Sequence, residues 1–157
     1  MEQAILTIAT KNCQLLVFRD VNYSQLAAEE LEHLALKLRV PVEICSENIV
    51  DTEVLAKLVR GLGNQSDQQQ RQILLLCGVY LEEQISVANR YMLAIGFDVY
   101  LIRDLIVPRV ADNAHIHDQR LSQAGAVTTT MPQIWYEWFV TEADQAPREI
   151  LLNYKSI

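Results

Sequence analysis

The sequence of 157 residues is poor in the features that would identify a function directly. Its three cysteines, Cys13, Cys45 and Cys77, are too few and too widely spaced to predict a disulfide framework or paired zinc ligands. No apolar run approaches the roughly 18 to 20 residues of a membrane span, and the N-terminus lacks the basic start and apolar stretch of a secretion signal. We therefore expect a cytoplasmic protein that does not enter a membrane.

Basic residues are also scarce. Lys and Arg number 13 against 20 Asp and Glu, which gives a formal net charge of −7. Because phosphate contacts need clustered Lys and Arg, this balance argues against a general nucleic-acid surface. The charge leaves open a neutral or cationic small molecule, or a protein partner, as the ligand.

What the chain does have is a hydrophobic share of 50% and a regular alternation of strand-like and helix-like segments, which predicts one domain over residues 1–157. We expect strands at 14–18, 42–45, 73–77, 99–102 and 126–129, and helices at 23–38, 51–62, 82–95 and 112–124 and from Pro132 onward. Continuous apolar strands in repeated βα units indicate a three-layer α/β/α sandwich. Its doubly wound, mainly parallel sheet should have about five or six strands.

Several local details accompany this fold. Asp51 and Asp112 are expected to cap the helices that follow them, and Gly63, Gly96 and Gly125 to end helices. The inner face of the 82–95 helix should include four apolar residues, Ile85, Ala88, Met92 and Ile95. The strand-like segments 4–9 and 149–154 could add an antiparallel edge or pair with another subunit, and the sequence does not choose between these.

The segment from Ile73 to Tyr80 is the most informative stretch of the chain. It is typical of a buried parallel strand that ends at Gly78, with a helix opening a few residues later. This arrangement places free helix N–H groups at the edge of a sheet where α/β proteins hold their ligands. The pocket residues that we expect there are Val79, Tyr80, Glu82, Glu83 and Gln84.

Three stretches together resemble the isochorismatase-like cysteine hydrolases, a family that includes the nicotinamidases. They are Leu15–Asp20, then Leu74–Tyr80 running into Gly96–Asp104, and Arg120–Thr130, which carries the run Ala-Gly-Ala-Val-Thr-Thr. The resemblance covers residues 13 to 140 approximately. It implies a Rossmann-like fold, a homo-oligomer and a cis peptide bond between Val79 and Tyr80.

The resemblance also implies a catalytic cysteine, an aspartate and a lysine, and this sequence departs from all three. Counting six residues from the strand-ending glycine puts Gln84 at the nucleophile position, where an amide cannot act as a nucleophile. The aspartate position falls on Arg19 or Asp20; successive strand residues point to opposite faces, so Asp20 would need a bulge or a strand end. Lys57, the only lysine between residues 45 and 73, has the spacing of a solvated surface residue.

Three other clusters have two interpretations each. Glu82 and Glu83 either stabilise a first helical turn or give the pocket a preference for a cationic or hydrogen-bond-donating ligand. His115 and His117 are two apart on a helix and do not face each other, so a metal site is not favoured over solvated histidines.

The aromatic residues of the last helix also allow two interpretations. Trp135, Trp138 and Phe139 share one face and should pack in the core, while a further aromatic looks outward. The alternative is that this helix packs against another subunit.

We therefore expect an isochorismatase-like protein that has lost its catalytic machinery and serves as a binding or assembly protein. It would have no cofactor and no metal, would form a homo-oligomer and could bind a small molecule. The first alternative is an active hydrolase of a small amide or ester that uses Cys77 or Cys45 with Asp20. The second is a flavodoxin-like or receiver-like module, although the phosphate-cradling loop of a flavin protein and the clustered acids of a receiver are missing, with only Asp20 and Asp104 as isolated candidates.

Overall fold

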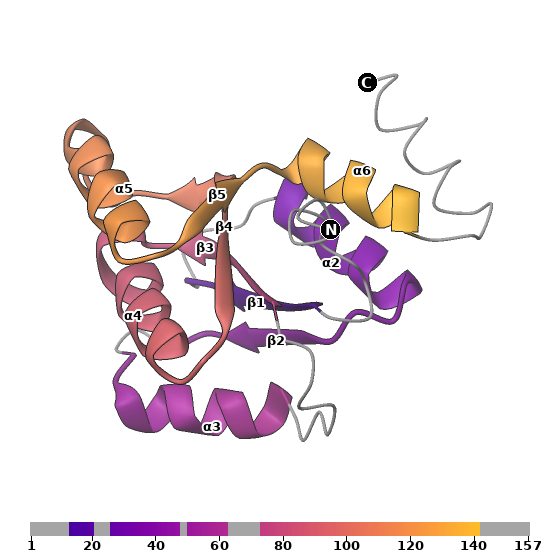
Figure 1. Cartoon of the computed structure of the whole chain (residues 1–157), viewed down its shortest axis with the longest axis horizontal. Helices are drawn as coiled ribbons and strands as arrows, with labels where there is room; N and C mark the ends of the chain where they lie inside the picture. The colour runs from indigo at the N-terminus through magenta and orange to yellow at the C-terminus, as the bar shows by residue number, and fades with distance from the viewer. Residues whose placement is uncertain (1–12, 21–25, 48–49, 63–72, 142–157) are drawn as a thin grey trace.

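The computed structural model describes residues 13–20, 26–47, 50–62 and 73–141 (Figure 1). Its sheet has five strands in the order β2-β1-β3-β4-β5, and every neighbouring pair is parallel. The strands are β1 (Cys13–Phe18), β2 (Val42–Cys45), β3 (Ile73–Val79), β4 (Asp98–Val107) and β5 (Val127–Thr129). The expected doubly wound parallel sheet is therefore confirmed.

Helices cover both faces of this sheet (Figure 1). The helices are α2 (Leu26–Lys37), α3 (Thr52–Leu62), α4 (Ser86–Ala94), α5 (Ala114–Gln123) and α6 (Met131–Thr141). Helices α3, α4 and α5 lie on one face, and α2 and α6 lie on the other. This arrangement gives the three layers of an α/β/α sandwich.

The central strands form the middle of the core. All six residues of β1 are buried, and so is every residue of β3 after Ile73. Because both strands are covered on two faces, their sequences are continuous apolar runs instead of alternating ones. Phe18 and Trp138 are the largest of the fully buried side chains, one from the sheet and one from α6.

Two strands are longer than the sequence predicts, and one helix begins differently. Strand β3 extends to Val79 and β4 to Val107, and the segment 82–95 begins with a π-helical turn, η2 (Leu81–Ile85), before α4. Ile85, Ala88 and Met92 are buried as expected, but Ile95 is 45% exposed. The helix ends at Ala94 and Gly96 adopts a φ of 106°, so Ile95 lies beyond the last turn and no longer follows the helical face.

The two capping predictions had different outcomes. The Asp51 carboxylate accepts a hydrogen bond from the Val54 N–H at 3.0 Å and caps α3 as expected. Asp112 does not cap α5, because it lies inside the 3-10 turn η3 (Ala111–Asn113) that precedes this helix. Asn113 stands at the N-cap position instead, without a side-chain capping bond.

The aromatic residues of α6 divide as expected for a helix packed within its own chain. Trp135 and Trp138 are buried, and Tyr136 is 51% exposed. The first N–H of the helix, that of Met131, donates to the Asp104 carboxylate at 2.9 Å, so an acid in the middle of β4 fixes where α6 begins.

Several expectations lie outside the described residues. These are the strand-like segments 4–9 and 149–154, the helix end expected at Gly63, the start of the helix at 23 and the side chain of Phe139.

Gly78 occupies the closest approach between two strands. It pairs with Phe18 across the β1–β3 ladder and has a φ of 108°. A Cβ atom at this position would overlap the Phe18 carbonyl oxygen, whereas a Cβ at Gly96, with a φ of 106°, would meet no atom within 4 Å. The two glycines therefore share a backbone conformation and differ in the space around them.

We expect Gly78→Ala to lower the free energy of unfolding far more than Gly96→Ala. The Gly96 variant carries only the cost of a left-handed alanine, about 1–2 kcal/mol, whereas the Gly78 variant adds a backbone overlap and should lose more than about 3 kcal/mol. Urea unfolding followed by circular dichroism measures both. Equal losses in the two variants would show that β1 and β3 are free to separate.

Candidate functional site

The carboxyl ends of β1 and β3 define the candidate site. In the order β2-β1-β3-β4-β5, the chain leaves β1 toward one side of the sheet and leaves β3 toward the other. Doubly wound proteins hold ligands at such a switch point, outside the carboxyl ends of the strands. Asp20 follows β1, and Tyr80 and the turn η2 follow β3, so these residues meet at one edge.

The backbone after β3 has the form that the family resemblance implies. The peptide bond between Val79 and Tyr80 is cis. The chain then enters η2, where the Ile85 N–H donates to the Tyr80 carbonyl oxygen, five residues back, at 3.2 Å. This wide turn is the kind of helical irregularity that is frequent at functional sites.

Gln84 lies in this turn and points back toward its beginning. Its side chain is only 5% exposed, and its carbonyl oxygen accepts the Tyr80 N–H at 3.2 Å. The amide thus satisfies a donor at the start of its own helix. A side chain in this position has a structural role, and it has no group that could attack a carbonyl carbon.

Arg19 and Asp20 point in different directions, as the alternation along a strand requires. The Arg19 guanidinium forms an ion pair with the Glu32 carboxylate of α2. The Asp20 carboxylate instead accepts a hydrogen bond from the Tyr80 hydroxyl at 3.2 Å. Of the two residues, the structure therefore brings Asp20 beside Tyr80 and holds Arg19 against α2.

Arg109 is a further residue of the candidate site. Its guanidinium lies 4.0 Å from the centroid of the Tyr80 ring and pairs with the Glu83 carboxylate, where Nη2 lies 3.2 Å from Oε1. Sequence reasoning missed this residue, which stands 29 positions after Tyr80. Val79 pairs with Val107 in the β3–β4 ladder, and this pairing brings together the residues that follow the two strands. The expectation that parallel strands end at the same edge of the sheet could therefore have indicated Arg109.

Glu82 and Glu83 are both engaged by the segment after β4. Glu82 accepts the backbone N–H groups of Arg109 at 2.8 Å and Val110 at 2.7 Å. Partial burial alone would raise the pKa of Glu82, but these two hydrogen bonds, a third with its own backbone and the interaction with His117 together lower the pKa below its ordinary value. The two acids therefore anchor this loop, which the sequence interpretations did not foresee.

The Tyr80 hydroxyl is also perturbed. Desolvation, followed by its hydrogen bond to the Asp20 carboxylate, raises the pKa of Tyr80 above its ordinary value. Asp20, Tyr80, Arg109 and Glu83 thus form a continuous chain of contacts at the ends of β1, β3 and β4.

The three thiols are buried, which is the expected state of Cys45 and Cys77. Burial raises the pKa of Cys77 and of Cys13 to about 12, and burial likewise raises the pKa of Cys45. Thiols in this state are almost entirely protonated near pH 7, and the thiolate is the reactive form.

A groove of about 240 Å³ lies beside β2 and α3 and includes Cys45, one of the two thiols of the active-hydrolase alternative. Cys45 and Lys57 both line it, with Glu43 and Glu47 among its other residues. Lys57 is exposed, as expected. The two acids and the buried thiol do not give Cys45 the electropositive, accessible setting of a reactive cysteine.

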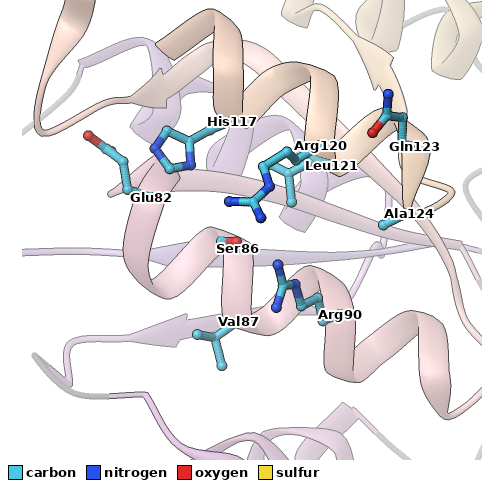
Figure 2. Close-up of a pocket in the computed structure, with 9 residues that line it drawn as sticks. All are labelled: Glu82, Ser86, Val87, Arg90, His117, Arg120, Leu121, Gln123 and Ala124. Atoms are coloured by element: carbon cyan, nitrogen blue, oxygen red, sulfur yellow. The ribbon is translucent and has the colours of Figure 1, made fainter. Parts of the chain in front are cut away.

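A second groove, of about 370 Å³, lies between α4 and α5 (Figure 2). We call it the arginine groove; its lining residues are Glu82, Ser86, Val87, Arg90, His117, Arg120, Leu121, Gln123 and Ala124. His117, which the sequence suggested only as a metal ligand or a solvated residue, lines this groove. The part of the chain that the structure describes contains no group of three His, Cys, Asp or Glu side chains that could hold a metal.

Within the described ranges, no helix is both long enough and apolar enough to cross a bilayer.

Comparison with known proteins gives matches in structure but not in sequence. No family model and no curated protein matches the chain. The YcaC gene product of Escherichia coli, described as an octameric hydrolase of unknown specificity, is 18% identical with a TM-score of 0.66, over 96% of this chain and 97% of that one. YcaC from Pseudomonas aeruginosa, solved with hexane-2,5-diol and covalent acrylamide, is 14% identical with a TM-score of 0.62, over 95% and 97%.

A third solved structure, the MAR1 ribonuclease from Caenorhabditis elegans, is 16% identical with a TM-score of 0.67, over 92% of this chain and 90% of that one. At such identities the likeness establishes a shared fold.

We expect Gln84→Met to lower the free energy of unfolding by about 1–3 kcal/mol, because methionine keeps the volume but leaves the Tyr80 N–H without its acceptor. Thermal or urea unfolding measures the loss. Gln123→Met, at an exposed position of α5, is the matched control and should change stability by less than about 0.5 kcal/mol. Similar small changes in both variants would contradict a structural role for Gln84.

Proposed function

We propose that this chain, which has the isochorismatase-like fold, is a non-catalytic binding or assembly protein. The solved structures that it resembles belong to the isochorismatase-like cysteine hydrolase superfamily, so the resemblance found in the sequence is confirmed at the level of the fold. The observation that carries the proposal is Gln84, a buried amide engaged with the backbone at the position where the family resemblance implies a thiolate.

The surroundings of Gln84 support the same conclusion. Covalent catalysis needs a nucleophile that a neighbouring base can activate. Here the Asp20 carboxylate accepts a hydrogen bond from the Tyr80 hydroxyl, and the face of the Tyr80 ring is in contact with Arg109. The groups that would position a substrate are in contact with one another, and none of these contacts involves a sulfur atom.

The active-hydrolase alternative has weaker support. It requires a thiolate from Cys77 or Cys45, and burial raises the pKa of both thiols. Cys77 is fully buried inside β3 and precedes Gly78, on the strand side of the switch point. A substrate could reach its sulfur only if the strand were exposed.

The flavodoxin-like alternative shares the strand order observed here, so topology does not separate it from the proposal. The similarity to the two YcaC proteins and to MAR1, which covers nine-tenths or more of this chain, favours the isochorismatase-like fold.

Assembly into a homo-oligomer in the cytoplasm is the second part of the proposal. The YcaC protein of Escherichia coli is described as octameric. In this chain, β2 pairs only with β1 among the described strands, and Ile44 on β2 is substantially exposed. An unpaired strand edge with an exposed apolar residue is suited to a contact between copies. Tyr136 on α6 is a second apolar residue that faces outward.

We expect the purified protein to hydrolyse no small amide or ester. We also expect all three cysteines to react slowly with a thiol-directed electrophile at pH 7, because they are buried and protonated. Labelling in 6 M guanidinium counts the thiols that the fold protects. Turnover that is lost in Cys77→Ser or Cys45→Ser, but kept in the control Cys13→Ser, would contradict the proposal and establish the hydrolase.

We also expect native mass spectrometry to show more than one copy of the chain in the particle. Ile44→Glu, which places a charge on the exposed edge of β2, should reduce the number of copies, whereas Leu36→Glu on α2 should leave it unchanged. A monomer in the unaltered protein would contradict the assembly part of the proposal while leaving the role of Gln84 untouched.

A further inference from the structure

We propose that the arginine groove between α4 and α5 binds the phosphate group of a small molecule. This site adjoins the contacts between Asp20, Tyr80 and Arg109 through Glu82, which accepts the Arg109 N–H, but it does not rest on the proposed loss of catalysis. An anionic ligand is not among those that the net charge left open, which were a neutral or cationic small molecule and a protein partner.

The geometry brings two guanidinium groups to one space. Arg90 comes from α4 and Arg120 from α5, and Figure 2 shows both guanidinium groups directed into the gap between these helices. The side chain of Ser86, one turn before Arg90, lies beside them in the same view. Two planar forks and a hydroxyl offer donors from several directions, which matches the oxygens of a phosphate better than a single carboxylate.

The two arginines of the groove differ in their partners from three other arginines of the chain. Three other arginines form ion pairs with carboxylates: Arg19 with Glu32, Arg103 with Asp118 and Arg109 with Glu83. Neither Arg90 nor Arg120 forms an ion pair within the described part of the chain. Two like charges directed at one space repel each other, and an anion between them would turn this repulsion into attraction.

Glu82 is the acidic residue among the described residues that line the groove, and its carboxylate is already engaged by another segment. Both of its carboxylate oxygens accept backbone N–H groups of the loop after β4. His117 lines the groove as well, and its interaction with Glu82 favours the ionised form of that acid. Among the described lining residues, the side of the groove formed by Arg90 and Arg120 therefore carries positive charge.

The dimensions and the remaining lining favour a small molecule. A volume of about 370 Å³ lies within the range of small-ligand sites, about 300 to 1,000 Å³. Val87, Leu121 and Ala124 provide apolar surface for a compact body attached to the phosphate. A nucleic acid would also bring phosphates, but the net charge of −7 opposes a polyanion.

Phenyl phosphate is a suitable probe, because it joins a phosphate to a small apolar group. Its binding can be followed by NMR through the Nε–Hε signals of the arginines, with phenol and inorganic phosphate as the two fragments. We expect the signals of Arg90 and Arg120 to shift, phenol to have no effect, and inorganic phosphate to bind more weakly than phenyl phosphate. Arg90→Gln and Arg120→Gln should each weaken binding about tenfold or more.

The control is Arg39→Gln, which removes the same charge from an exposed position outside the groove and should leave the affinity unchanged. Circular dichroism verifies that each variant is folded. Equal affinity in all variants, or an equal loss in Arg39→Gln, would overturn the proposal. So would a single-stranded oligonucleotide that binds through the same two arginines more tightly than phenyl phosphate, or a change in subunit number in Arg90→Gln without any ligand.

The result is independent of the test for catalysis. If the protein has no hydrolase activity and does not bind phenyl phosphate, only the proposed phosphate site is wrong. If it binds phenyl phosphate and has hydrolase activity, only the proposed function is wrong.

Discussion

The close approach of Gly78 to the backbone of Phe18 is the constraint on which the rest of the structure depends. It joins the two most deeply buried strands where the sheet reverses its winding, and only a residue without a Cβ fits between them. From that point the chain has two residues, Val79 and Tyr80, in which to leave β3 and enter the turn η2. The position of Tyr80, whose hydroxyl donates to Asp20 and whose N–H donates to Gln84, follows from this geometry.

The edge of the sheet is then stabilised by groups that connect segments distant in sequence. Glu82 holds two N–H groups of the loop after β4, and Glu83 pairs with Arg109 from the same loop. Charged groups near a helix start serve as ligand sites when their partners come from outside the protein. In this chain the partners are internal, so the two acids connect η2 to the loop after β4.

Much of the fold could be predicted because burial leaves a direct trace in the sequence. The apolar runs of β1 and β3 and the stop at Gly96 required only local reasoning. The sequence could not choose between Arg19 and Asp20, because that choice depends on where β1 ends and on a partner 60 residues later. The contacts of Arg109 and the groove of Arg90 and Arg120 were not predicted for a similar reason. Each brings together helices or strands whose relative position is fixed only by packing.

The contact between Arg109 and Tyr80 has a consequence for any molecule that approaches the switch point. A guanidinium tethered to the end of β4 is present at a high effective concentration, so it behaves as an intramolecular competitor for the face of the tyrosine ring. A ligand that stacks on this ring has to displace the Arg109 guanidinium, which stays attached to the chain beside it. The affinity of such a ligand would therefore depend on how well it replaces Arg109 as the partner of the Glu83 carboxylate.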